Sequence, residues 1–402
     1  MGFSDETVET VRALYPSLAD GHAYLDGAAG TQTPQPVIDA ISDAYRRGLG
    51  NVGGVFPASE RSTAIVAACR AAIADLVGGL PNGVILGPNM TTLTYRLARV
   101  LTGPGDEVVV SRLDHDANVR PWTQTGARVR WAEADPVTGE LPVEQYAELI
   151  GPGTRLVALT AASNTLGTRP DVAAICEIAH AAGALTFVDG VHATAHGPVD
   201  MHALGADFYA TSAYKWSGPH IGAVVADPVA LESLHPDKLL PSPDTVPERF
   251  ELGTAALADL AGVTAAVEHL ADLVPGTGSR RARLVASMTA AEEHELALFA
   301  AMMSGLETMP HVTVYGKPAR RTATAFFTVA GTTPQQVAEH LAGRGVNVWS
   351  GNMYAWELTG ALGVRDSGGA VRAGLVHYND RSDVERLLEG VAELRSTRPG
   401  RT

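Results

Sequence analysis

Lysine, cysteine and long apolar runs are scarce in this chain. Its 402 residues include three lysines and two cysteines. Two cysteines support neither a disulfide framework nor a zinc-binding spacing, so we expect no metal site of that kind. A reducing, cytoplasmic location is then the simplest interpretation. No apolar run reaches the roughly 18 residues of a membrane span, and the acidic N-terminus lacks the apolar segment of a signal peptide.

Basic residues are also in the minority. The chain has 30 Lys and Arg against 44 Asp and Glu, which gives a formal net charge of -14 at pH 7. Nucleic acids and anionic membranes attract clustered basic side chains, so we expect neither as the main partner. A content of 46% hydrophobic and 18% charged residues is typical of a packed globular protein. The length predicts two or more domains, because a single core rarely grows beyond about 300 residues.

The middle of the chain alternates β-rich runs with helical patterns at 90–101 and 171–183. Continuous apolar runs separated by helices are typical of a mostly parallel sheet that is covered on both faces. This pattern predicts an α/β, doubly wound fold. The expected strands are 83–87, 106–111, 154–161, 184–190, 206–212 and 220–227.

Strands and helices become fewer and shorter toward the C-terminus, which predicts a smaller α/β domain there. Residues 239–254 are rich in proline and are expected to form a loop, and a long helical pattern follows at 280–309. The predicted division is an N-terminal segment at 1–20 that packs on the small domain, a large domain at 21–260 and the small domain at 261–402.

Three polar residues follow strands, where open α/β sheets place their ligands. Asp189 ends "LTFVD", Lys215 follows "FYATS", and Asn164 follows "LVALTAAS". Thr91 and Thr92 open a helix after the loop "GPNM", and hydroxyls with free N–H groups at a helix N-terminus form an anion site. An acid, a lysine and a phosphate site at one sheet edge suit pyridoxal phosphate (PLP). The lysine would form a Schiff base, and the aspartate would pair with the pyridinium nitrogen.

Each of these residues also has a purely structural explanation. Asp189 could belong to an ordinary turn, Thr91 could be a plain N-cap, and Lys215 could extend to the surface. Their joint occurrence, in this order and spacing, favours the cofactor site.

The segment "VDGVHATAHGPVDMHALGADFYATSAYKWSGPHIGAVV" resembles the PLP segment of class V aminotransferases, in particular the cysteine desulfurase-like group. Four further blocks match in order, and the resemblance covers nearly the whole chain. It implies PLP fold type I, with a seven-stranded, mostly parallel sheet in the large domain and a smaller C-terminal domain. It also implies a homodimer with its sites at the interface. The further blocks are "LDHDANVRPW" (113–122), "SNTLGT" (163–168), "RFELGT" (249–254) and "VRAGLVHYND" (371–380).

The resemblance also assigns roles to single residues. Lys215 would hold PLP and take the Cα proton of the substrate. Arg372 would bind the substrate carboxylate through a bidentate fork, and His115 would take part in catalysis. The implied cofactor contacts are Lys215, Asp189 at the ring nitrogen, His115 on the ring face, Thr91, Thr92 and Ser212 at the phosphate, Asn164 and His192 near the ring hydroxyl, and Thr254 at the phosphate of the partner subunit's cofactor.

The chain differs from cysteine desulfurases in the residues that these enzymes use to abstract sulfur from the substrate. Their catalytic cysteine lies in a loop shortly before the arginine, and here that loop reads "SGNMYAWELTG", with Tyr354 in its place. A phenol with a pKa near ~10 cannot form a persulfide. Cys69 and Cys176 lie in Ala-rich helical patterns and are expected to be core residues. Tyr214 replaces the histidine before the lysine, and His192 replaces a glutamine.

We therefore expect that the residues for PLP chemistry are present and that the residues for sulfur abstraction are absent. The leading hypothesis is a PLP-dependent lyase that breaks the C–S bond of an S-substituted cysteine. It would be similar to PLP enzymes that process cysteine conjugates in lincosamide biosynthesis, a branch of secondary metabolism. The alternatives are decarboxylating oxidative deamination of such a conjugate, an aminotransferase, an epimerase, or a non-enzymatic protein of this fold.

Four residues keep two interpretations each. His192 could hydrogen-bond the cofactor or act as a catalytic acid, or it could be a satisfied buried histidine. Asn352, Tyr354 and Trp356 could bind a bulky S-substituent, with Tyr354 also catalytic, or the aromatic side chains could simply pack together.

Overall fold

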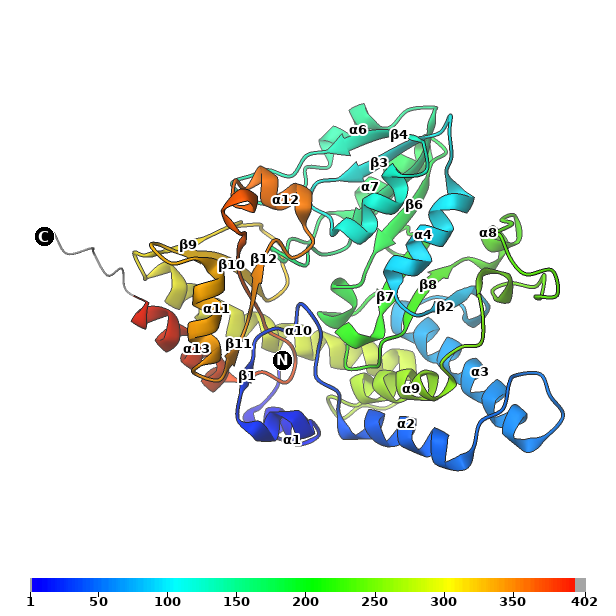
Figure 1. Ribbon diagram of the computed structural model, residues 1–402, viewed down its shortest axis with the longest axis horizontal. Coiled ribbons are helices and arrows are strands. Elements are labelled where there is room, and N and C mark those ends of the chain that lie inside the picture. Colours follow the sequence, from blue (N-terminus) through cyan, green and yellow to red (C-terminus); the bar gives the residue numbers. More distant parts are fainter. Residues whose placement is uncertain (1, 395–402) are drawn as a thin grey trace, which may run out of the picture.

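The central sheet has seven strands, and the computed structural model that contains it describes residues 2–394. The strands are β2 (Val84–Gly87), β3 (Glu107–Ser111), β4 (Arg128–Ala132), β5 (Thr154–Thr160), β6 (Leu185–Asp189), β7 (Phe208–Ser212) and β8 (Gly222–Ala226). Their order is β2-β8-β7-β6-β5-β3-β4 (Figure 1). β8 runs antiparallel to both of its neighbours, and the other neighbours are parallel. The predicted mostly parallel, seven-stranded sheet is confirmed.

The strand β4 is missing from those predicted by the sequence pattern. Its sequence "RVRWA" mixes charged with apolar residues, and only Ala132 is fully buried. β4 lies at the edge of the sheet. An edge strand is partly exposed to solvent, so it lacks the continuous apolar run that identifies a central strand.

Helices cover both faces of the central sheet, because successive side chains of a strand point to opposite faces. Val109 and Val157 belong to one core, and their neighbours Val108 and Leu156 belong to the other. The first core is covered by α2 (Gln35–Arg47), α3 (Pro57–Val77), α6 (Glu144–Leu149), α7 (Val172–Ala181) and α9 (Leu257–Ala271), and the second by α4 (Met90–Leu101), α5 (Arg120–Thr123) and α8 (Pro228–Glu232).

The C-terminal part contains a separate antiparallel sheet. Its order is β12-β13-β10-β9, and a short parallel pair, β1 with β11, lies beside it. The predicted smaller C-terminal α/β domain is thereby confirmed in its architecture. The strands are β1 (Ala23–Tyr24), β9 (Val312–Val314), β10 (Thr324–Val329), β11 (Val346–Asn347), β12 (Trp349–Gly351) and β13 (Ala370–Gly374), and the helices are α11 (Pro334–Ala342), α12 (Trp356–Ala361) and α13 (Arg381–Glu393).

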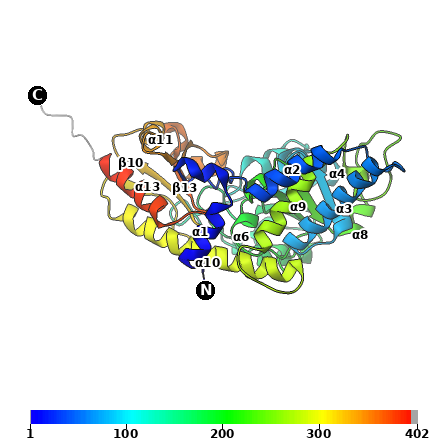
Figure 2. The same ribbon diagram turned by 90° about the horizontal axis from the view of Figure 1, so that it is seen from below.

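The long helix α10 (Arg280–Glu307) connects the two parts. Its first half contributes Leu284 and Met288 to a core of the central sheet, and its second half contributes Phe299 and Met302 to the core of the C-terminal sheet. Figure 2 shows the helix running along the lower side of both parts. Because one rigid helix belongs to both cores, it fixes how the two sheets are placed around the space between them.

The predicted domain boundaries fall within packed regions. Arg12 of α1 (Asp5–Ala13) donates to the Tyr378 carbonyl at 2.7 Å and pairs with Asp383 at 2.9 Å, so the N-terminal segment contacts the C-terminal part. Helix α9 packs against α2 and α3, and the boundary at 260 divides it. The division at 20 and 260 stays a prediction, and residues 1 and 395–402 of the predicted segments lie outside the described chain.

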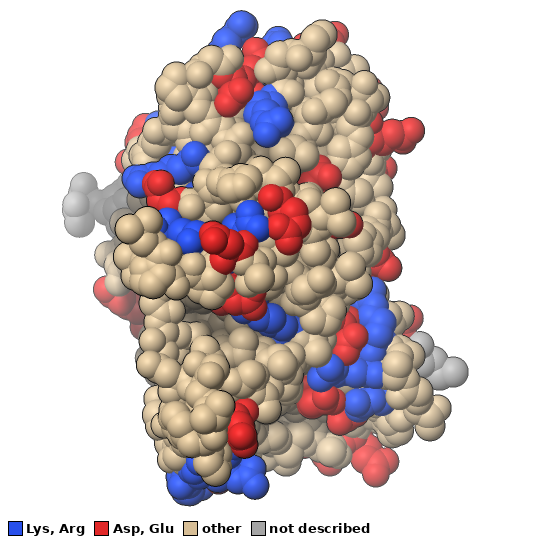
Figure 3. All heavy atoms as spheres, turned by 90° about the vertical axis from the view of Figure 1, so that its right-hand side faces the viewer, with Lys and Arg blue, Asp and Glu red and all other residues tan. Residues whose placement is uncertain are grey.

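Charged side chains of both signs are intermixed on the surface. Figure 3 shows basic groups beside acidic groups on a largely uncharged background. Among the described residues, Arg280 pairs with Asp75 at 2.7 Å, and the buried Arg249 pairs with the exposed Glu232 at 2.6 Å. Within residues 2–394, no helix has the length and apolar character needed to cross a membrane.

A buried arginine ties the loop before α9 to the central sheet. Arg70 donates to both carboxylate oxygens of Glu251, at 2.9 and 3.0 Å, and Glu251 also accepts the Leu86 N–H at 2.7 Å. Removing one partner of a buried ion pair leaves an uncompensated charge, so we expect Arg70→Met to lower the free energy of unfolding by about 3 kcal/mol. The exposed pair of Arg46 with Asp43 provides the control, where Arg46→Met should lower it by at most about 0.5 kcal/mol. Equal urea midpoints for the two variants would contradict this role of Arg70.

Candidate active site

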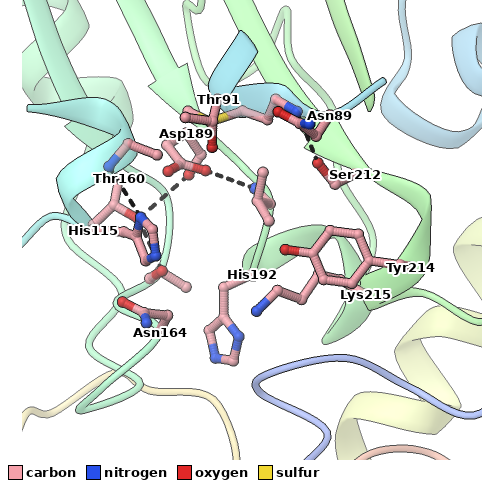
Figure 4. A pocket seen from close by; sticks show the side chains of 14 residues that line it. Asn89, Thr91, His115, Thr160, Asn164, Asp189, His192, Ser212, Tyr214 and Lys215 are labelled. Carbon is pink, nitrogen blue, oxygen red and sulfur yellow. Dashed lines mark hydrogen bonds between the residues drawn. The ribbon is translucent and has the colours of Figure 1, made fainter. Parts of the chain in front are cut away.

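A cavity lies at the carboxyl end of the central sheet (Figure 4). Thr160, Asp189 and Ser212, which are the last residues of β5, β6 and β7, line it. The N-terminus of α4 closes another side, where the Met90 N–H donates to Ser212 Oγ at 3.2 Å. The predicted site residues that line this cavity are Lys215, Asp189, His115, Thr91, Asn164, His192 and Ser212.

Lys215 is buried in a short 3-10 turn, Ala213–Lys215, directly after β7. Its Nζ donates to the carbonyl of Ala28 and forms no ion pair with any carboxylate of the described residues. Burial, together with the positive charge of Arg372, lowers the pKa of this amine to about 7, against the raising effect of Asp189. Much of the amine is therefore neutral near pH 7, which makes it available as a nucleophile and as a base.

Asp189 is the acidic group of the cavity. Its Oδ1 accepts the Val191 N–H at 2.9 Å. Burial raises the pKa of this carboxyl to about 6, against the lowering effects of that hydrogen bond and of Lys215. A protonated ring nitrogen placed beside Asp189 would lower the pKa of this carboxyl again and so hold it in the charged form.

His115 is held as a neutral imidazole. Its Nδ1 accepts the Ala117 N–H at 3.0 Å, so the proton of the neutral ring is on Nε2. Burial and, after it, the positive charges of Lys215 and Arg372 lower the pKa of His115 to about 3. The ring stacks on Tyr354, with ring centroids 5.4 Å apart and an angle of 25°.

One helix-cap residue, Asn89, and one glycine, Gly222, shape the end of the cavity at the N-terminus of α4. Asn89 caps α4, and its Oδ1 accepts the Thr92 N–H at 2.9 Å. A Cβ on Gly222 would lie 2.3 Å from the Asn89 carbonyl carbon, so only glycine permits this close approach of β8 to the helix. Thr91 reaches the cavity, whereas Thr92 and the exposed Thr254 are not among the described residues that line it.

A wider cleft of about 820 Å³ adjoins the cavity and extends toward the C-terminal part. Arg372 of β13 lines it and is buried, and its Nη1 donates to the Asn164 carbonyl at 2.9 Å. Its Nε has no partner, and Arg372 pairs with no carboxylate in the described chain. An unpaired buried guanidinium is costly unless an anion binds to it, which favours a carboxylate-bearing ligand.

The loop at 352–355 borders the same cleft. Met353 and Tyr354 have φ values of 56° and 54°, a left-handed conformation that non-glycine residues adopt rarely. Asn164 Nδ2 donates to the Met353 carbonyl at 2.9 Å, and the Asp116 N–H donates to the Tyr354 carbonyl at 2.7 Å. The Asn164 amide therefore fastens this loop, a contact that sequence reasoning did not anticipate.

The other predicted substrate residues lie around this loop. Asn352 lines the cleft and accepts the Tyr354 N–H at 3.0 Å. Trp356 opens α12 in a shallow pocket beside the cleft, with the Arg365 guanidinium 4.6 Å from its ring centroid. Tyr354 is 72% exposed.

Sequence reasoning missed Asn89 and Tyr214 as lining residues of the cavity. The cap position before a helix could have identified Asn89. Tyr214 precedes Lys215 and stacks on His220 with ring centroids 5.0 Å apart, a contact with no signal in the sequence.

Comparison with known proteins gives one consistent result. The model of the Aminotransferase class-V family matches residues 23–387. An uncharacterized protein of Mycobacterium tuberculosis is 38% identical over 96% of this chain and 99% of its own. A probable cysteine desulfurase of Pseudomonas aeruginosa is 35% identical over 94% of this chain and 96% of its own. A crystal structure of a cysteine desulfurase from Escherichia coli matches with a TM-score of 0.84 and 30% identity, covering 98% of both chains.

Proposed function

Because the chain belongs to the aminotransferase class-V family, we propose that it is a PLP-dependent lyase that cleaves the Cβ–S bond of an S-substituted cysteine. The observation that carries the proposal is that Lys215, Asp189 and His115 line one cavity, beside a cleft whose described lining includes Tyr354 and no cysteine. PLP is the cofactor of this family. When bound, it withdraws electrons from the substrate Cα and makes the bonds at Cα and Cβ labile.

The residues of the cavity fit PLP. A buried amine at Lys215, a buried carboxyl at Asp189 and the flat ring of His115 line one space. Lys215 would hold the cofactor covalently, Asp189 would face its ring nitrogen, and His115 would cover its ring. Thr91, Ser212 and the N-terminus of α4 would hold its phosphate.

The reaction of apoprotein with PLP should depend on the pKa of Lys215. Only the neutral amine attacks the carbonyl, and the fraction of neutral amine grows as pH rises through the pKa of about 7. We expect the rate of covalent attachment, followed by absorbance, to rise around pH 7 and then level off. A rise centred near the ordinary lysine value of about 10.4 would contradict this environment for Lys215.

Arg372 and the neutral groups around it would direct the substrate chemistry. A fork from Arg372 to the substrate carboxylate fixes one substituent of Cα and so determines which bond faces the cofactor ring. Lys215, neutral near pH 7, would take the Cα proton. The proton that Lys215 takes from Cα can pass from its ammonium to the departing sulfur, and the Nε2–H of the neutral His115 can donate a hydrogen bond to that sulfur. The overall reaction converts the conjugate and one water into a thiol, pyruvate and ammonium.

The chain lacks a sulfur nucleophile at the cleft. Cys69 and Cys176 are its two cysteines, and both are buried. Burial raises the pKa of each thiol to about 12, so neither forms a thiolate readily. Neither is among the described residues that line the cavity or the cleft. This supports elimination rather than persulfide formation. Both thiols are free, which agrees with a proposed reducing, cytoplasmic location.

The cleft supports a bulky substituent on sulfur. Tyr95, Trp349 and Tyr354 line it, and each of these side chains is more than one third exposed. Exposed aromatic surface around a concave site is typical of ligand binding. We therefore propose that these residues, with Asn352 and Trp356 beside them, contact the part of the substrate beyond the sulfur.

A product assay on PLP-loaded protein tests the proposal. A panel of S-substituted cysteines is supplied, and free thiol, pyruvate, alanine and carbon dioxide are measured together with the cofactor spectrum. We expect thiol and pyruvate in equal amounts, with conjugates that carry large apolar substituents cleaved faster than S-methylcysteine.

Other products would identify other reactions. Alanine with enzyme-bound sulfur from free cysteine would mean a desulfurase and would overturn the proposal. Carbon dioxide with an aldehyde would mean decarboxylating oxidative deamination. Spectral change with neither product, followed by exchange of the Cα proton, would mean an aminotransferase or an epimerase.

We also propose that the protein is a homodimer. Val55 and Leu240 are almost fully exposed, and Phe56, Leu239 and Leu252 are at least half exposed, in loops next to the site-bearing part. Exposed apolar residues in such numbers mark an interaction surface. Thr254 follows Leu252 in the same loop, where it would reach the cofactor of the second subunit. Light scattering should give twice the 41.9 kDa of one chain, and Leu240→Asp should shift the protein toward the monomer. A wild-type monomer would contradict the proposal.

A further inference from the structure

The cleft beside the cavity has an excess of basic side chains. Among the described residues that line it, Arg120, Lys215, Arg365 and Arg372 are basic and Asp116 carries the one carboxyl. The whole chain has the opposite balance, with a formal net charge of -14 at pH 7. A concave site lined by one sign of charge attracts ligands of the other sign. The counterions of each arginine therefore indicate how much negative charge a ligand of the cleft carries.

Two of the three arginines are already explained. Arg120 has its counterions within the protein, because it pairs with Asp116 at 2.8 Å and with Glu357 of α12 at 2.5 Å. Arg372 donates to the Asn164 carbonyl and is assigned above to the α-carboxylate of the substrate. Arg365 is the arginine of the cleft that the proposed reaction does not use.

Arg365 has one weak counterion. Its Nε donates to Asp366 Oδ1 at 3.3 Å, and the Asp366 side chain is 91% exposed. An ion pair so exposed to water contributes little, because the solvent screens both charges. Among the described residues, Arg365 pairs with no other carboxylate, and its two Nη nitrogens have no hydrogen-bond partner. The guanidinium edge formed by these two nitrogens is left for a ligand, and its geometry matches a carboxylate.

The guanidinium of Arg365 is nevertheless held in place. It lies over the Trp356 ring, with Cζ 4.6 Å from the ring centroid. A Cβ on Gly360 would come within 2.8 Å of Nη1 and 3.2 Å of Cζ, so this glycine leaves the space in which the guanidinium lies against α12. A side chain that is ordered in advance loses less conformational entropy when a ligand binds. Trp356 and Gly360 thus position a cation on the wall of the cleft without neutralising it.

We propose that Arg365 determines specificity by binding a carboxylate at the far end of the sulfur substituent. This inference rests on the proposed function and names its substrate class, which is S-substituted cysteines whose substituent ends in an acid. Arg372 would bind the α-carboxylate and Arg365 the second one, and the exposed rings of Trp349 and Tyr354 would contact the apolar part between them. Elimination would consume one water and release a thiol that carries the second carboxylate, together with pyruvate and ammonium.

A matched pair of substrates tests the proposal, because S-benzylcysteine and S-(4-carboxybenzyl)cysteine differ by one carboxylate. We expect the PLP-loaded wild type to cleave the acid with a kcat/KM about tenfold higher, as a hydrogen bond to a charged group provides. Arg365→Gln should lose this preference and keep its kcat/KM for S-benzylcysteine within about threefold, which also shows that the variant is folded. Arg365→Lys should keep part of the preference, because it retains the charge but lacks the planar fork.

Arg344→Gln is the matched control for the loss of one positive charge. Arg344 pairs with Glu393 at 2.8 Å and is not among the described residues that line the cleft. This variant should keep the wild-type preference for the acid. Equal kcat/KM for the two compounds in the wild type, or the same preference in Arg365→Gln and the wild type, would overturn the proposal.

Binding measurements separate this proposal from the lyase reaction. The dissociation constant of each compound is obtained from the change that it causes in the cofactor spectrum. If neither compound yields thiol and pyruvate, the lyase reaction is wrong. Tighter binding of the acid in the wild type, abolished in Arg365→Gln, would still support the role of Arg365. The same ratio of dissociation constants in both proteins would exclude that role even where thiol is released.

Discussion

Replacing Lys215 with alanine is expected to abolish turnover, with kcat reduced by about a thousandfold or more. Lys215 is the buried amine of the cavity, and its lowered pKa of about 7 keeps it reactive near neutrality. Two functions disappear with it, because the same Nζ would hold the cofactor and take the Cα proton. The loss should therefore appear with every substrate of the panel and under every PLP-dependent reaction considered above.

The cofactor spectrum separates loss of chemistry from loss of folding. Lys215→Ala should still bind PLP through Asp189, His115 and the N-terminus of α4, but without the absorbance of a covalent adduct. The variant loses a buried amine that has no ion-pair partner among the described residues, so its thermal stability without PLP should not fall far below that of the wild type. Lys317→Ala, at an exposed lysine paired with Glu307, is the control and should retain full activity. Turnover by Lys215→Ala close to that of the wild type would exclude all PLP-dependent mechanisms that use this lysine.

Replacing Arg372 with glutamine is expected to lower kcat/KM by roughly a hundredfold to a thousandfold, because a charge-assisted fork to the substrate carboxylate is lost. Arg372 is buried, its Nε has no partner, and it forms no ion pair with a carboxylate of the described residues. The carboxyl of Asp26 raises the pKa of Arg372 without forming an ion pair with it. Burial raises the pKa of Asp26 itself to about 6. The structure therefore holds a cation that an anionic ligand would stabilise.

The stability of Arg372→Gln distinguishes a binding residue from a structural one. An arginine in a structural ion pair would destabilise the fold when removed, by about 3 kcal/mol. A binding arginine that is strained in the free protein should give an equal or higher midpoint of thermal unfolding when it is replaced. Arg344→Gln is the control, since this arginine pairs with Glu393 at 2.8 Å and is not among the described residues that line the cavity or the cleft. It should change kcat/KM by less than about threefold. A large fall in stability with unchanged kcat/KM for Arg372→Gln would contradict the proposed role.

Local sequence signals were sufficient for the elements that carry the cofactor residues. The helix expected at 90–101 coincides with α4, Met90–Leu101, because its apolar spacing and its cap are both encoded within one short segment. The strand ends at Asp189 and Ser212 followed from continuous apolar runs. β4 was not predicted, since an edge strand has no such run.

Contacts between distant segments could not be read from the sequence. Arg372 donates to Asn164, which is 208 residues away, and Asn164 donates to Met353, 189 residues away. The stacking of Tyr354 on His115 and the pair of His196 with Glu295 are of the same kind. Each depends on how two sheets are held by α10, and no local periodicity encodes that arrangement.

The sequence by itself determined the α/β class, the order of the cofactor residues and the absence of a cysteine in the loop before Arg372. These are properties of composition, of short-range periodicity and of residues at strand ends, which each segment carries on its own. Only the tertiary structure decided which charges are buried without partners and which neutral form His115 adopts. Burial and hydrogen-bond partners set the protonation of these groups, and both arise when segments far apart in the chain pack together.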